Sequence, residues 1–145
     1  MLRMNKKVEY GVIALLHLAI QPERVDSVRG ISAACQIPET LLSKIMQKMK
    51  SVGMVLPVHG NHGGYRLDRD LSQINLFDMN QALVGRVEVA ECLSDHKESL
   101  CPAKNRCSII TPMGILNQKL IELFQSTSLE TLARKGTHET SDLHG

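Results

Sequence analysis

Near the start of the chain, apolar residues recur at the spacing of an amphipathic helix. This helix is predicted over about residues 5–19, ahead of Pro22. Its apolar stripe consists of Val8, Val12, Leu15, Leu16 and Ala19. A shorter helix is predicted over residues 28–35, with Ile31 and Ala34 directed inward. Cys35 follows two alanines, so we interpret it as a small buried hydrophobe and not as a metal ligand.

A third helix is predicted from Pro38 to about Val52. Proline is favoured in the first turn of a helix, and Gly53 suits its end. Its inner face is apolar and consists of Leu41, Leu42, Ile45, Met46 and Met49. Its outer face is polar and basic and consists of Thr40, Ser43, Lys44, Gln47 and Lys48. Two helices joined by a tight turn, the second with such an outer face, predict a helix-turn-helix.

The next segment has the pattern of a β-hairpin. Residues 54–58 and 65–67 are strand-like, and the glycine-rich connection between them tolerates a tight turn. A hairpin after a helix-turn-helix is a wing. Its tip is expected to carry His59, His62 and Arg66 beside glycines whose bare backbone can approach a phosphate. The two histidines could instead bind a metal, but no carboxylate or thiol is near them in the sequence.

A long amphipathic helix is predicted further along the chain. Thr111 is a good N-cap with Pro112 at the first helical position, and the helix should continue to about Gln125. Its apolar stripe consists of Met113, Leu116, Leu120, Leu123 and Phe124. Such a stripe is too apolar for a helix in water, so we expect it to pack against its twin in a homodimer. Palindromic half-sites in double-stranded DNA would follow from the two-fold axis.

Three of the four cysteines lie in one polar segment, with the spacing C-x8-C-x5-C at Cys92, Cys101 and Cys107. A segment with so few apolar residues needs a cross-link or a bound metal to become ordered. Disulfide pairing would leave one thiol over, whereas a metal takes all three and a fourth donor. Thiolates favour zinc, copper(I) or iron–sulfur clusters. Solvent-facing thiols and a redox-active thiol switch remain alternatives.

Composition limits the class of protein. The 145 residues are 43% hydrophobic, which suits one compact domain with an accessory element. Residues 1–75 carry ten Lys/Arg against six Asp/Glu, so the amino-terminal half is the basic half. With no apolar run of membrane-spanning length and no signal peptide, we expect a cytoplasmic protein without membrane association. We find no nucleophile–base pair and no phosphate-binding loop, so an enzyme is not expected.

The string GMVLPVHGNHGGYRL resembles the wing of the Rrf-two-type bacterial regulators, which include iron–sulfur repressors of the IscR and NsrR types. Residues 74–85 are similar to the next helix of that family, and residues 127–133, TSLETLA, to the motif that ends its long helix. The three cysteines fall where its cluster loop lies. The resemblance covers almost the whole chain up to Ala133.

The resemblance implies a mostly α fold with a small β-hairpin wing. Residues 1–85 would form a winged helix-turn-helix DNA-binding domain, and residues 86–110 a cysteine-bearing cluster loop. Residues 111–134 would form the dimerisation helix with the carboxy-terminal motif of the family, and residues 135–145 a disordered tail.

The resemblance further implies that the three cysteines hold an iron–sulfur cluster, [2Fe-2S] or [4Fe-4S]. The histidine that is the fourth ligand in IscR-like proteins would fall at Ile110, which cannot ligate. In NsrR-like proteins an acidic residue of the partner subunit takes this role, and Glu9 matches its position. Glu9 could instead pair with Lys6 or Lys7 on the surface. The local substitutes are Glu91, His96 and Glu98.

Individual side chains of the predicted DNA-binding surface have different expected roles. Polar residues of the third helix should read base edges, whereas lysines and Arg66 should neutralise phosphates. His59 stands where the family usually has an arginine, and imidazole is shorter and not permanently charged. Weaker contact or a different preferred sequence would follow. The complete predicted set is Arg3, Arg29, Thr40, Ser43, Lys44, Gln47, Lys48, His59, Gly60 and Arg66.

The sequence therefore predicts a homodimeric, DNA-binding repressor whose operator binding is controlled by an iron–sulfur cluster and which governs iron–sulfur assembly or iron homeostasis. A nitric-oxide-sensing repressor of the same family is one alternative. A cluster-free thiol redox switch and a zinc-stabilised regulator are two others.

Overall fold

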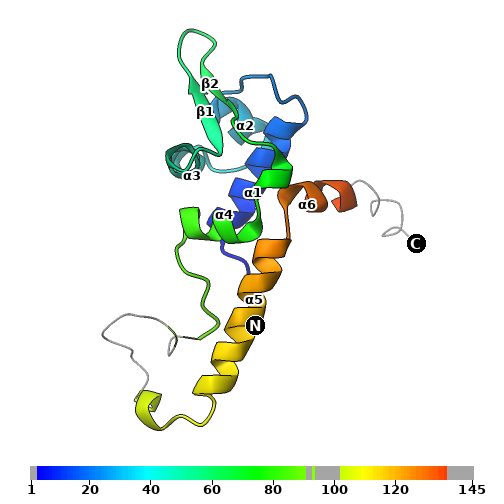
Figure 1. The fold of residues 1–145 in the computed structure, drawn as a ribbon. Helices are drawn as coiled ribbons and strands as arrows, with labels where there is room; N and C mark the ends of the chain where they lie inside the picture. Colours follow the sequence, from blue (N-terminus) through cyan, green and yellow to red (C-terminus); the bar gives the residue numbers. More distant parts are fainter. Residues whose placement is uncertain (1–2, 91–92, 94–101, 137–145) are drawn as a thin grey trace, which may run out of the picture.

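The computed structural model of the chain describes residues 3–90, 93 and 102–136. Within these ranges the protein is mostly helical and has a single antiparallel hairpin, as the sequence predicts (Figure 1). The helices are α1 (Lys6–Ala19), α2 (Val28–Cys35), α3 (Glu39–Ser51), α4 (Leu76–Leu83), α5 (Ile110–Ser126) and α6 (Leu129–Gly136). The strands are β1 (Val55–Val58) and β2 (Gly64–Leu67), and short 3₁₀ turns cover Leu71–Gln73 and Lys104–Arg106. None of the helices in the described ranges is long and apolar enough to span a bilayer.

Helices α1 to α4 pack around one hydrophobic core. Asn5 caps α1 by accepting a hydrogen bond from the backbone N–H of Lys7, and α1 then buries one apolar face. A Cβ at Gly11 would lie 2.7 Å from Cδ1 of Leu83, so glycine allows α1 and α4 to pack closely. Each fully buried leucine or isoleucine contributes about 1.5–3 kcal/mol through removal from water. The centre of this core consists of Leu15, Ile31, Leu42, Ile45, Met46, Met49, Met79 and Leu83.

A tight turn joins α2 to α3, which confirms the predicted helix-turn-helix. Ser27 caps α2 by accepting a hydrogen bond of 2.9 Å from the N–H of Gly30. Gln36 ends α2 in the left-handed conformation, with φ at 56°, and Ile37 is buried in the turn. Pro38 immediately precedes α3 at its N-cap position, where its missing N–H leaves no hydrogen bond unmade. The α2–α3 pair is thereby fixed relative to the core.

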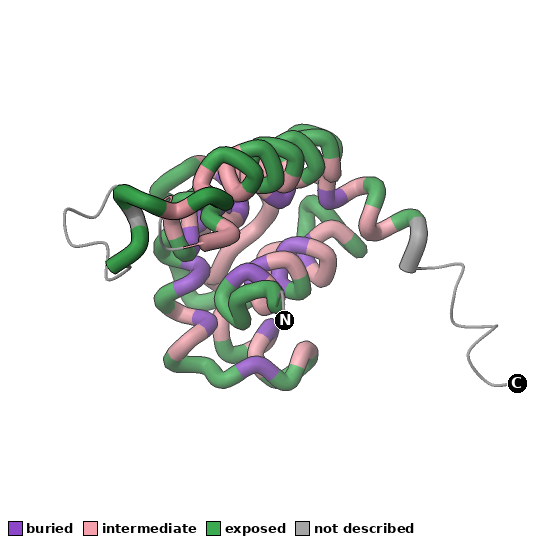
Figure 2. The backbone as a smooth tube through the Cα atoms, turned by 90° about the horizontal axis from the view of Figure 1, so that it is seen from below, coloured by how far each residue is buried: buried purple, intermediate pink, exposed green. Residues whose placement is uncertain are grey.

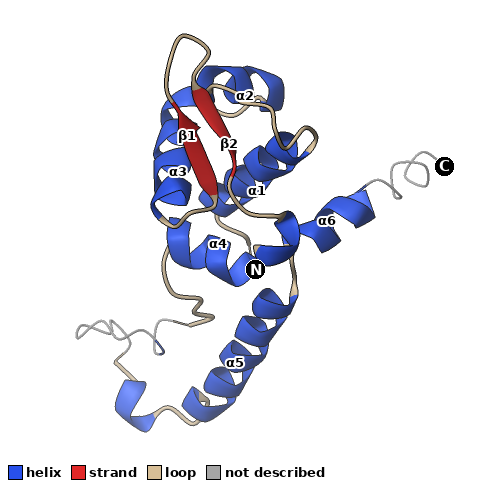
Figure 3. Ribbon diagram, turned by 45° about the horizontal axis from the view of Figure 1, so that its top comes forward, coloured by secondary structure: helices blue, strands red, loops and turns tan. Residues whose placement is uncertain are grey.

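The hairpin after α3 is the predicted wing. Strand β1 pairs antiparallel with β2 in the register Val55 with Leu67 and Val58 with Gly64. Met54 and Val55 are buried at its base, so the wing is attached to the core at that end. Figure 3 shows β1 between α3 and β2, and the tip of the hairpin extends beyond the helices.

Helix α5 packs differently from the other helices, because none of its described side chains is buried. Figure 2 shows this helix exposed or half-buried along its length. The prediction that Thr111 caps it is wrong, because the helix begins at Ile110 and has no side-chain cap. Thr111 and Pro112 lie in its first turn. Proline is tolerated there since the first four N–H groups of a helix have no intrahelical acceptor.

The TSLETLA motif does not simply end the long helix. Helix α5 stops at Ser126, and α6 begins at Leu129 and returns to the core. Backbone hydrogen bonds tie the junction to the start of α4, from Leu76 N–H to Thr127 O at 3.0 Å and from Leu129 N–H to Ile74 O at 2.8 Å. Helix α6 continues to Gly136, two residues into the predicted tail, and residues 137–145 lie outside the described ranges.

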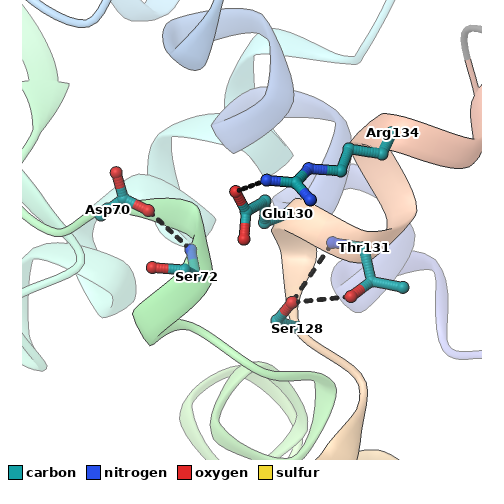
Figure 4. A network of polar contacts seen from close by, with 6 residues as sticks. All are labelled: Asp70, Ser72, Ser128, Glu130, Thr131 and Arg134. Carbon is teal, nitrogen blue, oxygen red and sulfur yellow. Dashed lines mark hydrogen bonds and ion pairs between the residues drawn. The ribbon is translucent and has the colours of Figure 1, made fainter.

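Polar contacts order the surface around α6 (Figure 4). The hydroxyl of Ser128 accepts the N–H of Thr131 at 3.2 Å, and Glu130 pairs with Arg134 at 2.7 Å. Close to them, Asp70 accepts the backbone N–H of Ser72, and this hydrogen bond lowers the pKa of the Asp70 carboxyl. Helix α6 is therefore distinct from α5: Ser128 caps its start, and Leu129 packs it against the core.

Candidate nucleic-acid interface and metal centre

The outer face of α3 presents most of the side chains predicted to contact DNA. Thr40, Lys44 and Gln47 are exposed, and Ser43 is half-buried beside them. They lie together because residues three and four apart share one face of a helix. The opposite face of α3 is held in the core, so the outer face has a fixed orientation. Such a face suits insertion into a major groove.

Lys48 lies at the edge of this surface. Its ammonium group donates at 3.4 Å to the backbone carbonyl of Leu83, the last residue of α4. This distance is at the long end for a hydrogen bond, so the interaction is weak. Lys48 therefore lies close to the junction between α3 and α4 but stays exposed, so both Lys44 and Lys48 contribute positive charge to this surface.

The tip of the wing consists of residues 59–63. His59, Gly60 and His62 are all exposed there, as predicted. The N–H of Gly63 closes the turn by donating to Gly60 O at 3.0 Å. Gly60 has a φ of +121°, and a Cβ built on it would meet no atom within 4 Å. The tip thus offers two imidazoles and bare backbone to an approaching phosphate.

Arg66 is not at the tip, contrary to the sequence prediction. It lies within β2 opposite Leu56, because the connecting turn is confined to residues 59–63. Its side chain is half-buried and lines a cleft of about 460 Å³ between the hairpin and α6. Glu23, Asp68 and Glu130 line the same cleft and lower its net charge.

The remaining predicted DNA contacts lie in two places. Arg29 is exposed in the first turn of α2, which is the first helix of the helix-turn-helix. Arg3 lines a groove with Asn80, Arg86 and Phe124, between the end of α4 and α5. The structure therefore places Arg29 in the first helix of the helix-turn-helix and Arg3 near the long helix.

Of the three clustered cysteines, only Cys107 lies within the described ranges. It is half-buried, and it connects the turn at Lys104–Arg106 with the start of α5. Cys92 and Cys101 lie outside these ranges, as do Glu91, His96 and Glu98. Among the residues that the structure describes, no three His, Cys, Asp or Glu side chains gather closely enough to hold a metal ion.

The chain leading into the cysteine segment is held against α5. The backbone N–H of Val89 donates to Oδ1 of Asn117 at 2.9 Å. Asn117 is seven residues, or about 10 Å, along the helix from Ile110. Both flanks of the segment therefore meet the first half of α5. The sequence patterns did not single out Asn117, because it begins a run of three polar residues, Asn117 to Lys119, in the middle of the helix.

Glu9, the predicted fourth ligand, has a local partner. Its carboxylate pairs with the ammonium of Lys6 at 2.6 Å, and that hydrogen bond and charge raise the pKa of Lys6. Lys6 is 67% exposed, and an exposed pair of this kind contributes little to stability. The surface alternative for Glu9 is thus present in the single chain. The weakness of the pair leaves the carboxylate available to another charged group.

Cys35 is chemically separate from the clustered cysteines. Its side chain packs against the core at the end of α2. Burial raises the pKa of its thiol, and the charge of Asp26 raises it further. A thiol that resists ionisation is a poor metal ligand and nucleophile. This environment agrees with the interpretation of Cys35 as a small packing residue.

A helix-turn-helix followed at once by a two-stranded hairpin defines a winged helix-turn-helix protein. Residues 4–135 match the family described as "Rrf2: Iron-dependent Transcriptional regulator". The chain therefore belongs to the Rrf2 family of DNA-binding transcriptional regulators.

Relatives of known name agree with this assignment. The chain is 27% identical to the transcriptional regulator IscR of Xenorhabdus nematophila, over 92% of this chain and 80% of the relative. It is 23% identical to the transcriptional regulator NsrR of Shouchella clausii, over 86% of this chain and 81% of the relative. The solved structure of CymR, the global cysteine regulator of Bacillus subtilis, is similar with a TM-score of 0.71. It is 25% identical and covers 93% of this chain and 98% of CymR.

Proposed function

We propose that this protein is a homodimeric repressor whose operator binding is controlled by an iron–sulfur cluster, and that it governs iron–sulfur assembly or iron homeostasis. The observation that carries the proposal is the position of the three-thiol segment. The residues on either side of this segment lie beside α5. The junction between α5 and α6 is hydrogen-bonded to the start of α4 in the winged helix-turn-helix core. A group bound by the thiols would therefore act on the element that connects to the DNA-binding surface.

The donor set fits a soft metal centre. Cys92, Cys101 and Cys107 supply three thiolates, which favour iron–sulfur clusters and zinc over hard cations. Glu9 of a second subunit is our proposed fourth donor, because Lys6 holds its carboxylate only weakly. A carboxylate is a harder ligand than a thiolate and would be the most easily displaced of the four. A bound cluster would make the protein responsive to iron supply and to oxidants, because it would be lost when iron is scarce or when oxidants attack it.

Helix α5 supplies the support for a homodimer. Leu116 and Leu123 of α5 are 49% and 57% exposed, and Ile109 at its N-cap position is 54% exposed. The three residues recur every seven positions. Seven residues are close to two helical turns, so these side chains share one face. Burying such a face against the same face of a second copy is the usual solution for a symmetric dimer. Two recognition helices would then meet half-sites about 34 Å apart on one side of the DNA.

A nitric-oxide-sensing repressor is the second candidate, and the similarity to NsrR favours it. The same residues would hold the cluster in either case. The two candidates differ in the signal that abolishes operator binding, so the experiment must apply nitric oxide and iron depletion separately.

The test begins with protein purified without air or chelators. We expect visible absorption, and a native mass that includes iron and sulfide. Cys107→Ser should lose both, whereas the matched variant Cys35→Ser should retain them because Cys35 packs against the core. Glu9→Ala should shorten the lifetime of the cluster. An unchanged spectrum and lifetime in this variant would exclude Glu9 as a ligand.

Operator binding is then measured by gel shift on the DNA upstream of the gene for this protein. Binding should change when the cluster is destroyed by nitric oxide or by iron depletion. Colourless, iron-free protein that binds this DNA at full strength would overturn the cluster proposal. A bound zinc ion or a disulfide under oxidant would each identify one of the alternatives, the zinc-stabilised regulator or the thiol switch.

A further inference from the structure

Asp26 joins the wing to the rest of the DNA-binding domain through its backbone. Its N–H donates to Tyr65 O at 3.0 Å, and the N–H of Tyr65 donates back to Asp26 O at 2.8 Å. Tyr65 also faces Pro57 across the hairpin, so β2 is paired on both of its edges. Asp26 therefore acts as a third, one-residue strand beside the half of β2 that lies nearer the tip of the wing.

Gly64 makes this contact possible. A Cβ built on Gly64 would collide with the backbone oxygen of Asp26 and would lie 2.7 Å from the N of Ser27. Both are backbone atoms, which cannot move aside as a flexible side chain could. The close approach of β2 to the segment before α2 is thus a specific feature of this wing.

The side chain of Asp26 ties the same point to α1. Its Oδ2 lies 2.9 Å from Nε2 of His17, and the two side chains are 15% and 24% exposed. His17 is on α1 between Leu15 and Leu18, both of which are buried in the core. Gly30 leaves room for the other carboxylate oxygen, since a Cβ there would collide with Oδ1 of Asp26. One aspartate thus contacts α1, the start of α2 and β2.

We propose that Asp26, held in place by His17, is a positioning residue that fixes the wing relative to the helix-turn-helix. The two DNA-contacting parts, the α3 face and the wing tip, then reach the duplex in one preset arrangement. Without this tie the wing would have to be ordered at the moment of binding, and the entropy of ordering would reduce affinity. The inference rests on the family's DNA binding and not on the proposed cluster.

The sign of the effect separates this role from simple electrostatics. Removing a carboxylate reduces repulsion of the phosphate backbone, so charge alone would make Asp26→Ala bind DNA more tightly. If Asp26 positions the wing, Asp26→Ala should instead bind DNA about five-fold more weakly than the wild type. Glu23→Ala is the matched control, because Glu23 is an exposed carboxylate in the same loop between α1 and α2. It should show the electrostatic gain alone.

Conservative variants still test the role of Asp26 if Asp26→Ala folds poorly. Asp26→Asn and His17→Gln each keep a hydrogen-bonding group at the junction. His17→Gln should bind a labelled mixed-sequence duplex nearly as well as the wild type, and Asp26→Asn at least as well, because it also removes a carboxylate charge. His17→Leu removes the partner but keeps an apolar side chain next to the core, and it should lose affinity as Asp26→Ala does. Equal affinities for His17→Gln and His17→Leu would overturn the role of this pair.

A double-mutant cycle tests whether Asp26 acts through the wing. His59→Ala removes a side chain at the tip, and the cost of Asp26→Ala should be smaller in that background. Equal costs in both backgrounds would mean that Asp26 does not act on the tip. Amide exchange without DNA gives a second readout. Exchange in β2 should accelerate in His17→Leu while exchange in α3 stays unchanged, and equal acceleration in both would indicate general destabilisation instead.

Discussion

At the scale of single residues, burial along α3 follows the period of the helix. Met46 and Met49 are fully buried as expected. Lys48 is exposed on α3 as expected, whereas Arg66 lines a cleft instead of lying at the tip of the wing. Burial is set by local periodicity, whereas the location of a long charged side chain depends on neighbours distant in sequence.

Cys35 provides a residue-scale prediction about pH. Because burial and then Asp26 raise the pKa of its thiol, the thiolate fraction at any given pH is lower than for an ordinary cysteine. Alkylation of Cys35 in the folded protein should therefore be slow at neutral pH and should accelerate only at higher pH than in the urea-unfolded chain. Mass spectrometry of the peptide containing Cys35 measures both rates. Identical pH profiles would contradict the shift.

His59 provides a second residue-scale prediction. Replacing it with arginine adds a permanent charge and a longer reach at an exposed position of the wing tip. His59→Arg should bind DNA more tightly and steepen the plot of log affinity against log salt by about 0.9. Fluorescence anisotropy over a salt series measures this slope. A tighter complex with an unchanged slope would mean that the new contact is not to a phosphate.

At the scale of secondary-structure elements, helices α1, α2 and α3 and the hairpin could be predicted because their signals are local, whereas α4 was expected only from the family resemblance. The α2 bounds agree with those expected, α1 differs by one residue at its start, and α3 differs by one residue at each end. The break between α5 and α6 could not be predicted in the same way. It depends on the pairing of Ser128 with Asn75, which are far apart in sequence. The anchoring of Val89 by Asn117 is another such tertiary contact.

Helix α6 therefore yields a prediction about stability. Leu129 is fully buried in the core although it lies beyond the long helix. Leu129→Ala should lower the free energy of unfolding by about 3 kcal/mol, because it removes apolar contacts and leaves a cavity. Leu123→Ala is the matched control, since Leu123 is 57% exposed on α5 and should change the stability of the single chain much less. Urea denaturation compares the two. Similar losses in both variants would mean that α6 is not part of the core.

At the scale of the whole molecule, one arrangement links the cysteines to DNA recognition. Cys107 lies three residues before the start of α5. The other end of α5 is attached by backbone hydrogen bonds to the start of α4. Helix α4 in turn packs against α1 and α3. The sequence indicated the cysteine cluster and the recognition helix separately. The path between them required the tertiary structure, since no local pattern encodes the return of α6 to the core.

The exposed face of α5 leads to the last prediction, which concerns assembly. If this face meets its twin, a charge at its centre would be buried without a partner, at a cost of several kcal/mol. Leu116→Glu should therefore produce monomers in analytical ultracentrifugation with unchanged helical content. Gln118→Glu adds the same charge on the other side of the helix and should remain dimeric. The monomer should bind a palindromic duplex far more weakly than the dimer does, because only one recognition helix can dock at a time. A Leu116→Glu protein that remains dimeric would place the subunit contact elsewhere than on this face.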